Sequence, residues 1–521
     1  MEDLNALGQK MYHVLDHVER QQRSRDKKQM RDEKVHVVGA GSVVTAAYEQ
    51  LRNAAENSEE HLLLKNAVRR YYNRLFMTRS ADAAATSAEE LVTELTFAGY
   101  IPNDSIGENV LKRINKLAAS YYAAYAGVHA DKTLLNTKVE PWVVDVLAVD
   151  VARLFQDGTL RDAYAQFAFE HFKQIVDISA LFPEKTPRDV DQALFIGIQR
   201  SLVKADEAMI RAALLTSYQA DPSSFAMYCR INTEIDTLLA SPTADKLARY
   251  VSVEGAPLRV VERMLETQSE QFRQLLSHKK RFLGAFEEQV GAEYATINRR
   301  INRGIVKSIV FLVITKFLIG IAIEVPYDYM IHGGIIWPAL LVNLFFPPLY
   351  MMLLRTTLTL PTSANTIRLT KQAEEMFYDA PKKQLKRAKK QFGAMYNVLY
   401  TLFMLAVFGG VAWLLFMYLH FDWLHLLIFF VFLSGASFLG FRLSRMIREI
   451  ESVETRQNGV TLVRDFLYMP FVVVGRWISE KYSQVNVVAL VLDMLIELPL
   501  KTVLRLIRQW SAFISVKKDQ L

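Results

Sequence analysis

The stretch SIVFLVITKFLIGIAIEVPYDY, residues 308–329, decides the fold class because it is long and almost uninterrupted in its apolar character. A helix needs about 20 mainly apolar residues to cross the ~30 Å hydrocarbon layer of a bilayer. The run over 305–324 meets that length, although it contains Lys316 and carries Glu324 just before Pro326. We therefore predict a membrane-spanning helix that holds two ionisable residues.

Three further apolar segments follow, at about 335–354, 397–419 and 423–441. The second contains Pro338, Pro347 and Pro348, so we expect it to be kinked or re-entrant. Lys and Arg crowd the flanks before the first segment, between the second and third, and after the fourth, while VPYDYMIHGG and HFD contain none. This alternation follows the positive-inside rule. It predicts four crossings of a cell or inner membrane, with both termini cytoplasmic.

The net positive charge of the chain is explained by where its basic residues lie. The chain has 521 residues, of which 51% are hydrophobic, and a formal net charge of +7. Because the basic residues flank the apolar segments, the charge does not require a nucleic-acid partner, and we expect none. The single cysteine, Cys229, rules out an intrachain disulfide and a cysteine-rich zinc site.

Helical periodicity dominates the first 300 residues. Hydrophobic residues recur at helical spacing from the start of the chain, at Leu4, Leu7, Met11, Leu15 and Val18. Ser87 with Glu90 has the spacing of a capping box, Gly99 that of a helix stop, and Pro187 and Pro242 that of first helical residues. Period-2 strand patterns are few.

These patterns predict an all-α fold, with a helical N-terminal cytosolic domain, a four-helix transmembrane bundle and C-terminal amphipathic helices. We expect five parts: a charged amphipathic helix or arm over 1–34, a helical cytosolic domain over 35–256, a stalk helix over 257–304, a transmembrane domain over 305–441, and membrane-associated amphipathic helices over 442–521.

Lys316 and Glu324 are the first candidate site residues. A charge near the bilayer centre costs roughly 2.5–3.5 kcal/mol on insertion scales, so it normally faces protein or water. On a regular helix the two residues lie about 12 Å apart along the axis and about 80° apart around it, which predicts that they share a broad face but do not touch. Asn343, in the second segment, is a possible partner. The alternatives are an ion or proton path, a snorkelling lysine with a boundary glutamate, or a structural pair between helices.

Glu497 is the fourth intramembrane polar candidate. LIELP at 495–499 repeats the AIEVP pattern of 322–326, and two such half-broken helices can form a cation site in transporters, although chance also produces so short a match. Residues 460–516 predict either amphipathic helices, with Asp493, Glu497, Lys501, Arg505 and Arg508 on one face, or a hairpin of two more spans.

The segment PKKQLKRAKKQF, residues 381–392, predicts a basic helix beside the membrane. Its cations would meet anionic headgroups at roughly 1 kcal/mol each, or would only set the topology. They are Lys382, Lys383, Lys386, Arg387, Lys389 and Lys390. We expect a bilayer with anionic headgroups as a partner.

The remaining motifs give no support for an enzyme. VVGAGSVV places Val44 where a dinucleotide loop needs its third glycine, and His13 with His17 lacks a third metal ligand. We expect no catalysis, cofactor or metal. The leading hypothesis is a membrane-anchored scaffold or sensor, which binds a protein partner or a second copy through its N-terminal domain. The alternative is an ion or small-solute transporter or channel whose path involves Lys316, Glu324 and Asn343.

Overall fold

The computed structural model describes residues 3–29, 34–37, 46, 49–50, 53, 60–77, 80–130, 139–156, 158–176, 186–379, 394–452 and 459–485. Within these ranges every regular element is a helix, and an isolated antiparallel bridge joins Lys34 to Gly107. The prediction of an all-α fold is confirmed.

Two compact units divide the chain, and each is described by itself. The first holds the described residues up to Ser252, and the second holds those from Val253 to Val485. The helices of the first unit are α1 (Ala6–Gln29), α3 (Glu60–Met77), α4 (Ala81–Ala85), α5 (Ala88–Phe97), α6 (Glu108–Ala130), α7 (Val139–Phe155), α8 (Thr159–Ile175), α10 (Pro187–Ser201), α11 (Glu207–Ser217), α12 (Phe225–Leu239) and α13 (Pro242–Glu254).

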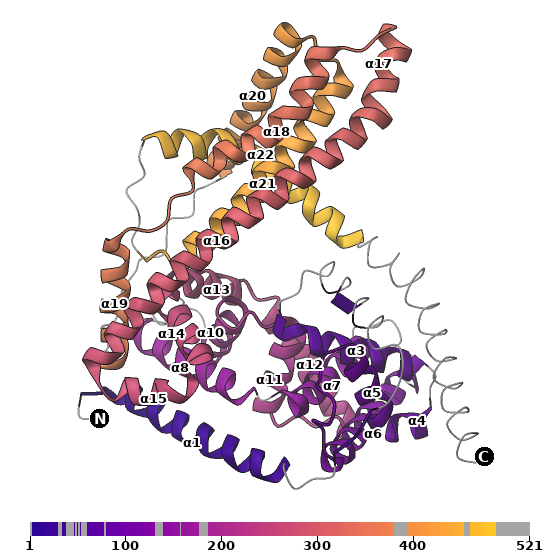
Figure 1. Ribbon diagram of the computed structural model, residues 1–521. Coiled ribbons are helices and arrows are strands. Elements are labelled where there is room, and N and C mark those ends of the chain that lie inside the picture. The colour runs from indigo at the N-terminus through magenta and orange to yellow at the C-terminus, as the bar shows by residue number, and fades with distance from the viewer. Residues whose placement is uncertain are drawn as a thin grey trace, which may run out of the picture. The chain divides into compact units, whose positions relative to one another are not determined.

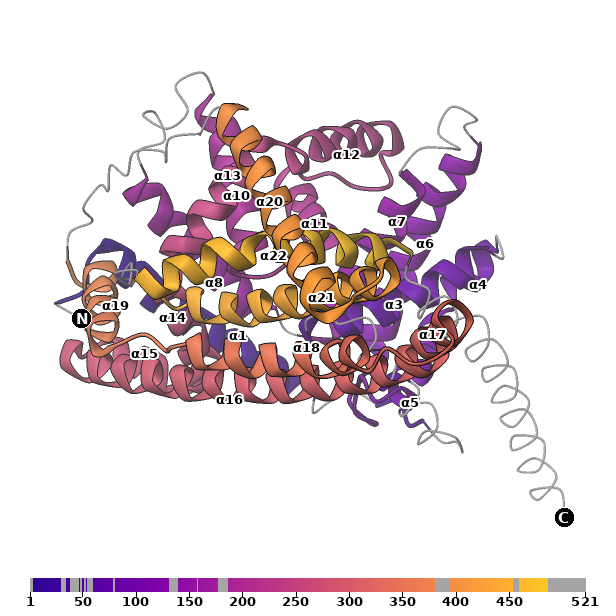
Figure 2. The ribbon, with the colours of Figure 1, turned by 90° about the horizontal axis from the view of Figure 1, so that it is seen from above.

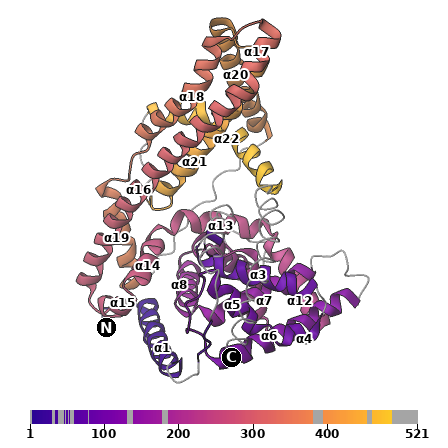
Figure 3. The ribbon, with the colours of Figure 1, turned by 45° about the vertical axis from the view of Figure 1, so that its right-hand side comes forward.

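The first unit is organised around α7, which packs against α3, α6 and α11. Figure 3 shows α3 and α6 beside it. Val143, Leu147 and Val151 recur every four residues along α7 and are fully buried, so one stripe of this helix lies in the core. Helix α1 packs on α8 through the hydrophobic stripe expected from Leu4 to Val18, whose five members are at most 5% exposed.

Helix ends in this unit follow local sequence signals, with one exception. Pro187 and Pro242 open α10 and α13, and Gly99 follows α5 with φ +79°, a left-handed conformation that glycine adopts without steric cost. The exception is the expected capping box. Ser87 precedes α5, but its hydroxyl donates to the Ala84 carbonyl instead of capping the helix.

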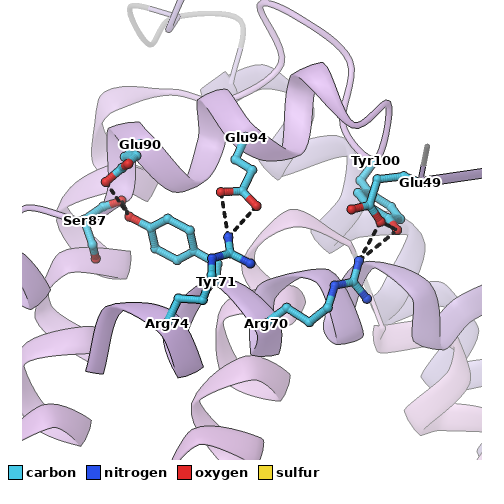
Figure 4. A network of polar contacts seen from close by, with 8 residues as sticks. All are labelled: Glu49, Arg70, Tyr71, Arg74, Ser87, Glu90, Glu94 and Tyr100. Carbon is cyan, nitrogen blue, oxygen red and sulfur yellow. Dashed lines mark hydrogen bonds and ion pairs between the residues drawn. The ribbon is translucent and has the colours of Figure 1, made fainter. Parts of the chain in front are cut away.

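Partly buried polar contacts join α3 to α5 and to Tyr100 (Figure 4). Arg74 donates to both carboxylate oxygens of Glu94, at 2.6 and 2.9 Å, and the Tyr71 hydroxyl lies 3.3 Å from Glu90. Glu49 accepts from Arg70 at 2.6 Å and from Tyr100 at 2.8 Å. Burial, with the Glu49 charge, raises the pKa of Tyr100 to about 12. The Tyr100 hydroxyl therefore stays protonated at neutral pH and is the donor in this contact.

The second unit comprises α14 (Ala256–Thr267), α15 (Ser269–Leu276), α16 (Lys279–Ile319), a π-helical turn η1 (Gly320–Glu324), α17 (Val325–His332), α18 (Trp337–Thr357), α19 (Ser363–Phe377), α20 (Ala394–Leu419), α21 (Trp423–Arg448) and α22 (Gly459–Val485). We expected one stalk helix over 257–304. The structure has three helices there, because the helix is interrupted at Gln268 and again at Ser277–His278.

Four helices of this unit are long and apolar enough to cross a membrane. They are the continuous helix Lys279–His332, Trp337–Thr357, Met395–Leu419 and Trp423–Arg448. Large apolar side chains cover their outer faces, such as Phe311 at 59% and Phe345 at 62% exposure, as expected for helices surrounded by lipid. The proline-containing second segment forms one continuous helix from Trp337 to Thr357, with Pro347 and Pro348 inside it.

Helices α16, α18 and α21 run alongside one another, and α22 packs on α21 (Figures 1 and 2). Glycines allow close approach at the crossings. A Cβ added at Gly304 would lie 2.7 Å from Leu443, one at Gly440 would lie 2.7 Å from Leu354, and one at Gly475 would lie 2.1 Å from the backbone oxygen of Ser434. These contacts fix the relative depth of the helices within the bundle, which positions the polar residues described next.

Candidate functional site: a buried polar cluster in the helix bundle

Lys316 lies inside the bundle because it continues the buried stripe of α16. Ile305 and Leu312 precede it at helical spacing and are also buried, and Lys316 itself is 2% exposed. Its ammonium group lies 2.7 Å from Glu324 Oε1 and 4.8 Å from the centre of the Phe432 ring. Our expectation that Lys316 and Glu324 do not touch is therefore wrong.

The cause is the π-helical turn η1, in which the Val325 N–H donates to the carbonyl of Gly320, five residues back. Pro326 has no N–H to offer the Ala322 carbonyl, which weakens the regular ladder at this point. A π turn holds one more residue than an α turn, so it removes about 100° of rotation and changes the offset between the two side chains from about 80° to about −20°. Both side chains then lie on one face.

Asn343 joins the ion pair to two neighbouring helices. It is fully buried in α18, and its Nδ2 lies 3.3 Å from Glu324 Oε2 and 3.3 Å from the backbone carbonyl of His425 in α21. One amide therefore contacts η1 and α21 at once. Three of the four polar residues expected within the membrane are brought together in this way.

Asp328 and His425 extend the cluster, and sequence reasoning did not identify them. Both are fully buried, and His425 Nε2 lies 3.3 Å from Asp328 Oδ1. The other oxygen of Asp328 accepts from the Ile336 N–H at 2.9 Å, and His332 Nδ1 lies 3.9 Å from Oδ1. Asp328 was hidden in a stretch read as a loop, but α17 continues the helix to His332. His425 was detectable as an ionisable residue inside the fourth apolar segment.

Tyr327 and Asp422 close the cluster near the ends of α17 and α21. The Tyr327 hydroxyl donates to one Asp422 oxygen, and the other accepts from the Trp423 N–H at 2.7 Å, which caps α21. The hydrogen bond from Tyr327 holds the pKa of the Asp422 carboxyl below its usual range. Asp422 is therefore an anion at neutral pH.

Several buried atoms of the cluster have no hydrogen-bond partner among the described residues. They are Asp328 Oδ1, Asn343 Oδ1, both ring nitrogens of His425 and Ser434 Oγ. The close approach of His425 to Asp328 has a geometry that is not that of a hydrogen bond. Unpaired polar atoms in a protein interior carry a desolvation cost of about 1–3 kcal/mol, so this region is less completely satisfied than the Lys316–Glu324 pair.

Polar contacts continue toward the arginine-bearing ends of the helices. The hydroxyls of Tyr350 in α18 and Ser437 in α21 lie 2.9 Å apart. Further along, Arg355 donates to Asn302 at 2.7 Å and to Asn298 at 2.9 Å, which ties α18 to α16. The bundle is therefore joined by polar contacts at several levels along its helices. Of these contacts, the Lys316–Glu324 pair is the buried ion pair.

The other predicted site residues lie outside the described residues. These are Glu497 and the six cations of 382–390. The predicted amphipathic face from Asp493 to Arg508 lies outside them as well. Helix α22, which is described, carries exposed apolar side chains such as Phe466 and Trp477 in addition to its buried face.

In the part of the chain that the structure describes, no group of three His, Cys, Asp or Glu residues is placed to hold a metal ion. Comparisons with protein-family models, with curated proteins and with solved structures found no match to this chain. The functional conclusion therefore depends on the geometry alone.

Proposed function

We propose that this chain is a non-catalytic, membrane-anchored scaffold or sensor. In this proposal the bundle of the second unit is the anchor, and the helical first unit binds a protein partner or a second copy of the chain. The observation that carries the proposal is the state of the charges in the bundle. Lys316 and Glu324 are 2% and 0% exposed and lie 2.7 Å apart.

A direct buried pair favours an anchor over a pore. An ion path requires polar groups that are exposed to the path and free to exchange one ligand for another. Lys316 instead donates to Glu324, and the second oxygen of Glu324 faces Asn343. Each group is engaged by another part of the same bundle, which is how a structural ion pair fixes the register of neighbouring helices.

The distribution of basic residues supports one orientation of the chain in the membrane. Cations are abundant on α16 before residue 308 and on α21 after residue 441, whereas 325–336 and 420–422 contain no Lys or Arg. The positive-inside rule then supports a cytoplasmic location for both termini and contact of the basic ends with an anionic leaflet.

A second candidate is a proton-linked transporter or channel. It is favoured by the unpartnered atoms of His425, Asp328 and Asn343, because intramembrane chains of ionisable groups are typical of proton relays. The relay would include Glu324 and Lys316, since the Asn343 amide contacts both Glu324 and the backbone carbonyl of His425.

Flux through reconstituted liposomes separates the two functions. The full chain is compared with the double variant Lys316→Met/Glu324→Gln and with Lys280→Met, a matched control that removes an exposed lysine from the same helix. A scaffold gives H⁺, K⁺ and Cl⁻ permeabilities equal to those of empty liposomes in all three. A flux in the wild type that the double variant abolishes and the control retains would overturn the scaffold proposal.

A further inference from the structure

The arginine-bearing ends of the bundle form a belt of net positive charge. We define this cationic belt by residues 298–307 of α16, Arg355 of α18 and residues 442–451 of α21. Together they carry eight Lys or Arg residues and only two carboxylates, Glu449 and Glu451. Its exposed cations are Arg299, Arg300, Arg303, Lys307, Arg442, Arg445 and Arg448.

Helix packing places these cations at one depth. The hypothetical Cβ of Gly304 lies 2.7 Å from Leu443, so the middle of the α16 segment meets the start of the α21 segment. Arg355 binds Asn298 and Asn302 of α16 through side-chain oxygens that are neutral. The charge of Arg355 is therefore held at the same depth without being cancelled.

Acidic side chains of the same unit lie elsewhere or are already paired. Glu374 of α19 pairs with Lys279 at 2.7 Å, and Lys279 lies twenty residues before Arg299, about 30 Å along α16. Within the belt, Glu449 lies 3.7 Å from Arg445. An excess of positive charge therefore faces outward.

The belt borders the apolar surface of the bundle. Val306, Val310 and Phe311 are 52–60% exposed and follow directly after Arg303 along α16. The exposed surface thus changes from cationic to apolar within about two helical turns, which is the spacing at which a bilayer changes from headgroup to hydrocarbon. A soluble polyanion would match the charge of the belt but not the apolar surface beside it.

We propose that the cationic belt is a binding surface for the headgroups of anionic phospholipids, with Arg299, Arg303 and Lys307 as its principal contacts. These three residues recur every four positions and line one face of α16, all of them exposed. Phosphate oxygens accept hydrogen bonds from Arg and Lys, and the acyl chains of the same lipid cover the apolar side chains above. The inference rests on the membrane anchoring that we propose above and names the lipid partner of that anchor.

The test measures selective lipid association. The full chain in phosphatidylcholine nanodiscs is titrated with fluorescent phosphatidylglycerol or fluorescent phosphatidylcholine, and the ratio of the two association constants is the readout. One fully engaged cation corresponds to a preference of about five-fold for the anionic lipid. We expect the wild type to show at least that preference, and the triple variant Arg299→Gln/Arg303→Gln/Lys307→Gln to reduce it to about one.

Two matched variants make the result decisive. A charge-retaining triple, Arg299→Lys/Arg303→Lys/Lys307→Arg, should keep most of the preference. A control triple, Arg113→Gln/Lys116→Gln/Lys246→Gln, removes three exposed cations from the first unit and should leave the preference unchanged.

Three results would overturn the proposal. They are an unchanged preference in the α16 Gln triple, an equal loss in the control triple, which would indicate a general charge effect, and competition by inorganic phosphate at matched ionic strength, which would indicate a soluble anion. Flux is not part of this readout, so failure here leaves the scaffold proposal standing.

Discussion

The Lys316–Glu324 pair should dominate the energetics of the bundle, and replacing one partner is the sharpest test of its geometry. At the observed 2.7 Å, two unit charges attract by about 6 kcal/mol at an effective dielectric constant of ~20, and the cost of burying both charges offsets much of this. Removing one partner strands the other in an apolar interior. We expect Lys316→Met to lower the free energy of unfolding by about 3–5 kcal/mol.

The double variant Lys316→Met/Glu324→Gln should recover most of that loss, since replacing a buried pair by neutral groups of similar size is often close to neutral. The assay is reversible unfolding of the full chain in mixed detergent micelles by increasing SDS, followed by far-UV circular dichroism. The quantity of interest is the coupling energy of the double-mutant cycle, which we expect to be about 2–4 kcal/mol.

The single variant Glu324→Gln supplies an independent check on the same pair. It strands the Lys316 ammonium group in the apolar interior, so it should cost about as much as Lys316→Met, about 3–5 kcal/mol. A coupling energy below about 0.5 kcal/mol would refute the assignment of a direct buried pair.

Three further predictions concern packing and pH. Gly475→Ala should destabilise the bundle by about 1–3 kcal/mol in the same SDS assay, because its Cβ would overlap the backbone of α21, whereas Gly435→Ala, where the Cβ meets open space, should change stability by less than about 0.5 kcal/mol. Asp422→Asn should cost about 1 kcal/mol, because the amide keeps only one of the two oxygens that accept from Tyr327 and from the Trp423 N–H. The hydrogen bond from Tyr327 lowers the pKa of Asp422, so the ionised carboxylate stabilises the wild type above the usual carboxyl pKa. This stability is lost as the pH falls through the lowered pKa of Asp422 in the folded state. The loss in acid should be smaller in Asp422→Asn. Burial lowers the pKa of His171 to about 4, so the first unit should lose up to about 3 kcal/mol between pH 6.5 and 4, seen as faster hydrogen exchange in α8, and His171→Gln should remove that loss.

The apolar surface of the bundle and its register have different origins. Hydropathy and length locate the four apolar helices, since both are properties of consecutive residues, and their observed spans lie close to the predicted segments. Periodicity likewise predicts the buried stripe from Leu4 to Val18, and prolines mark the starts of α10 and α13. Each of these features depends on residues within a few turns of one another.

Tertiary structure decided the contacts that local sequence patterns could not predict. Ser87 and Glu90 have the spacing of a capping box, but the Tyr71 hydroxyl of α3 lies within 3.3 Å of the Glu90 carboxylate, so packing between helices overrides a local motif. Asp328 and His425, nearly 100 residues apart, meet only because α17 extends the first apolar helix beside α21.

The contact between Lys316 and Glu324 could not be predicted from their spacing in the sequence. On a regular helix, a spacing of eight residues predicts that Lys316 and Glu324 do not touch. A single π turn changes the rotation between the two residues and brings their side chains into contact. The amino-acid sequence alone determined the helical class, the apolar segments and the distribution of basic charge. Only the tertiary structure decided which polar groups meet, because helix rotation and neighbour choice depend on packing against residues that are distant along the chain.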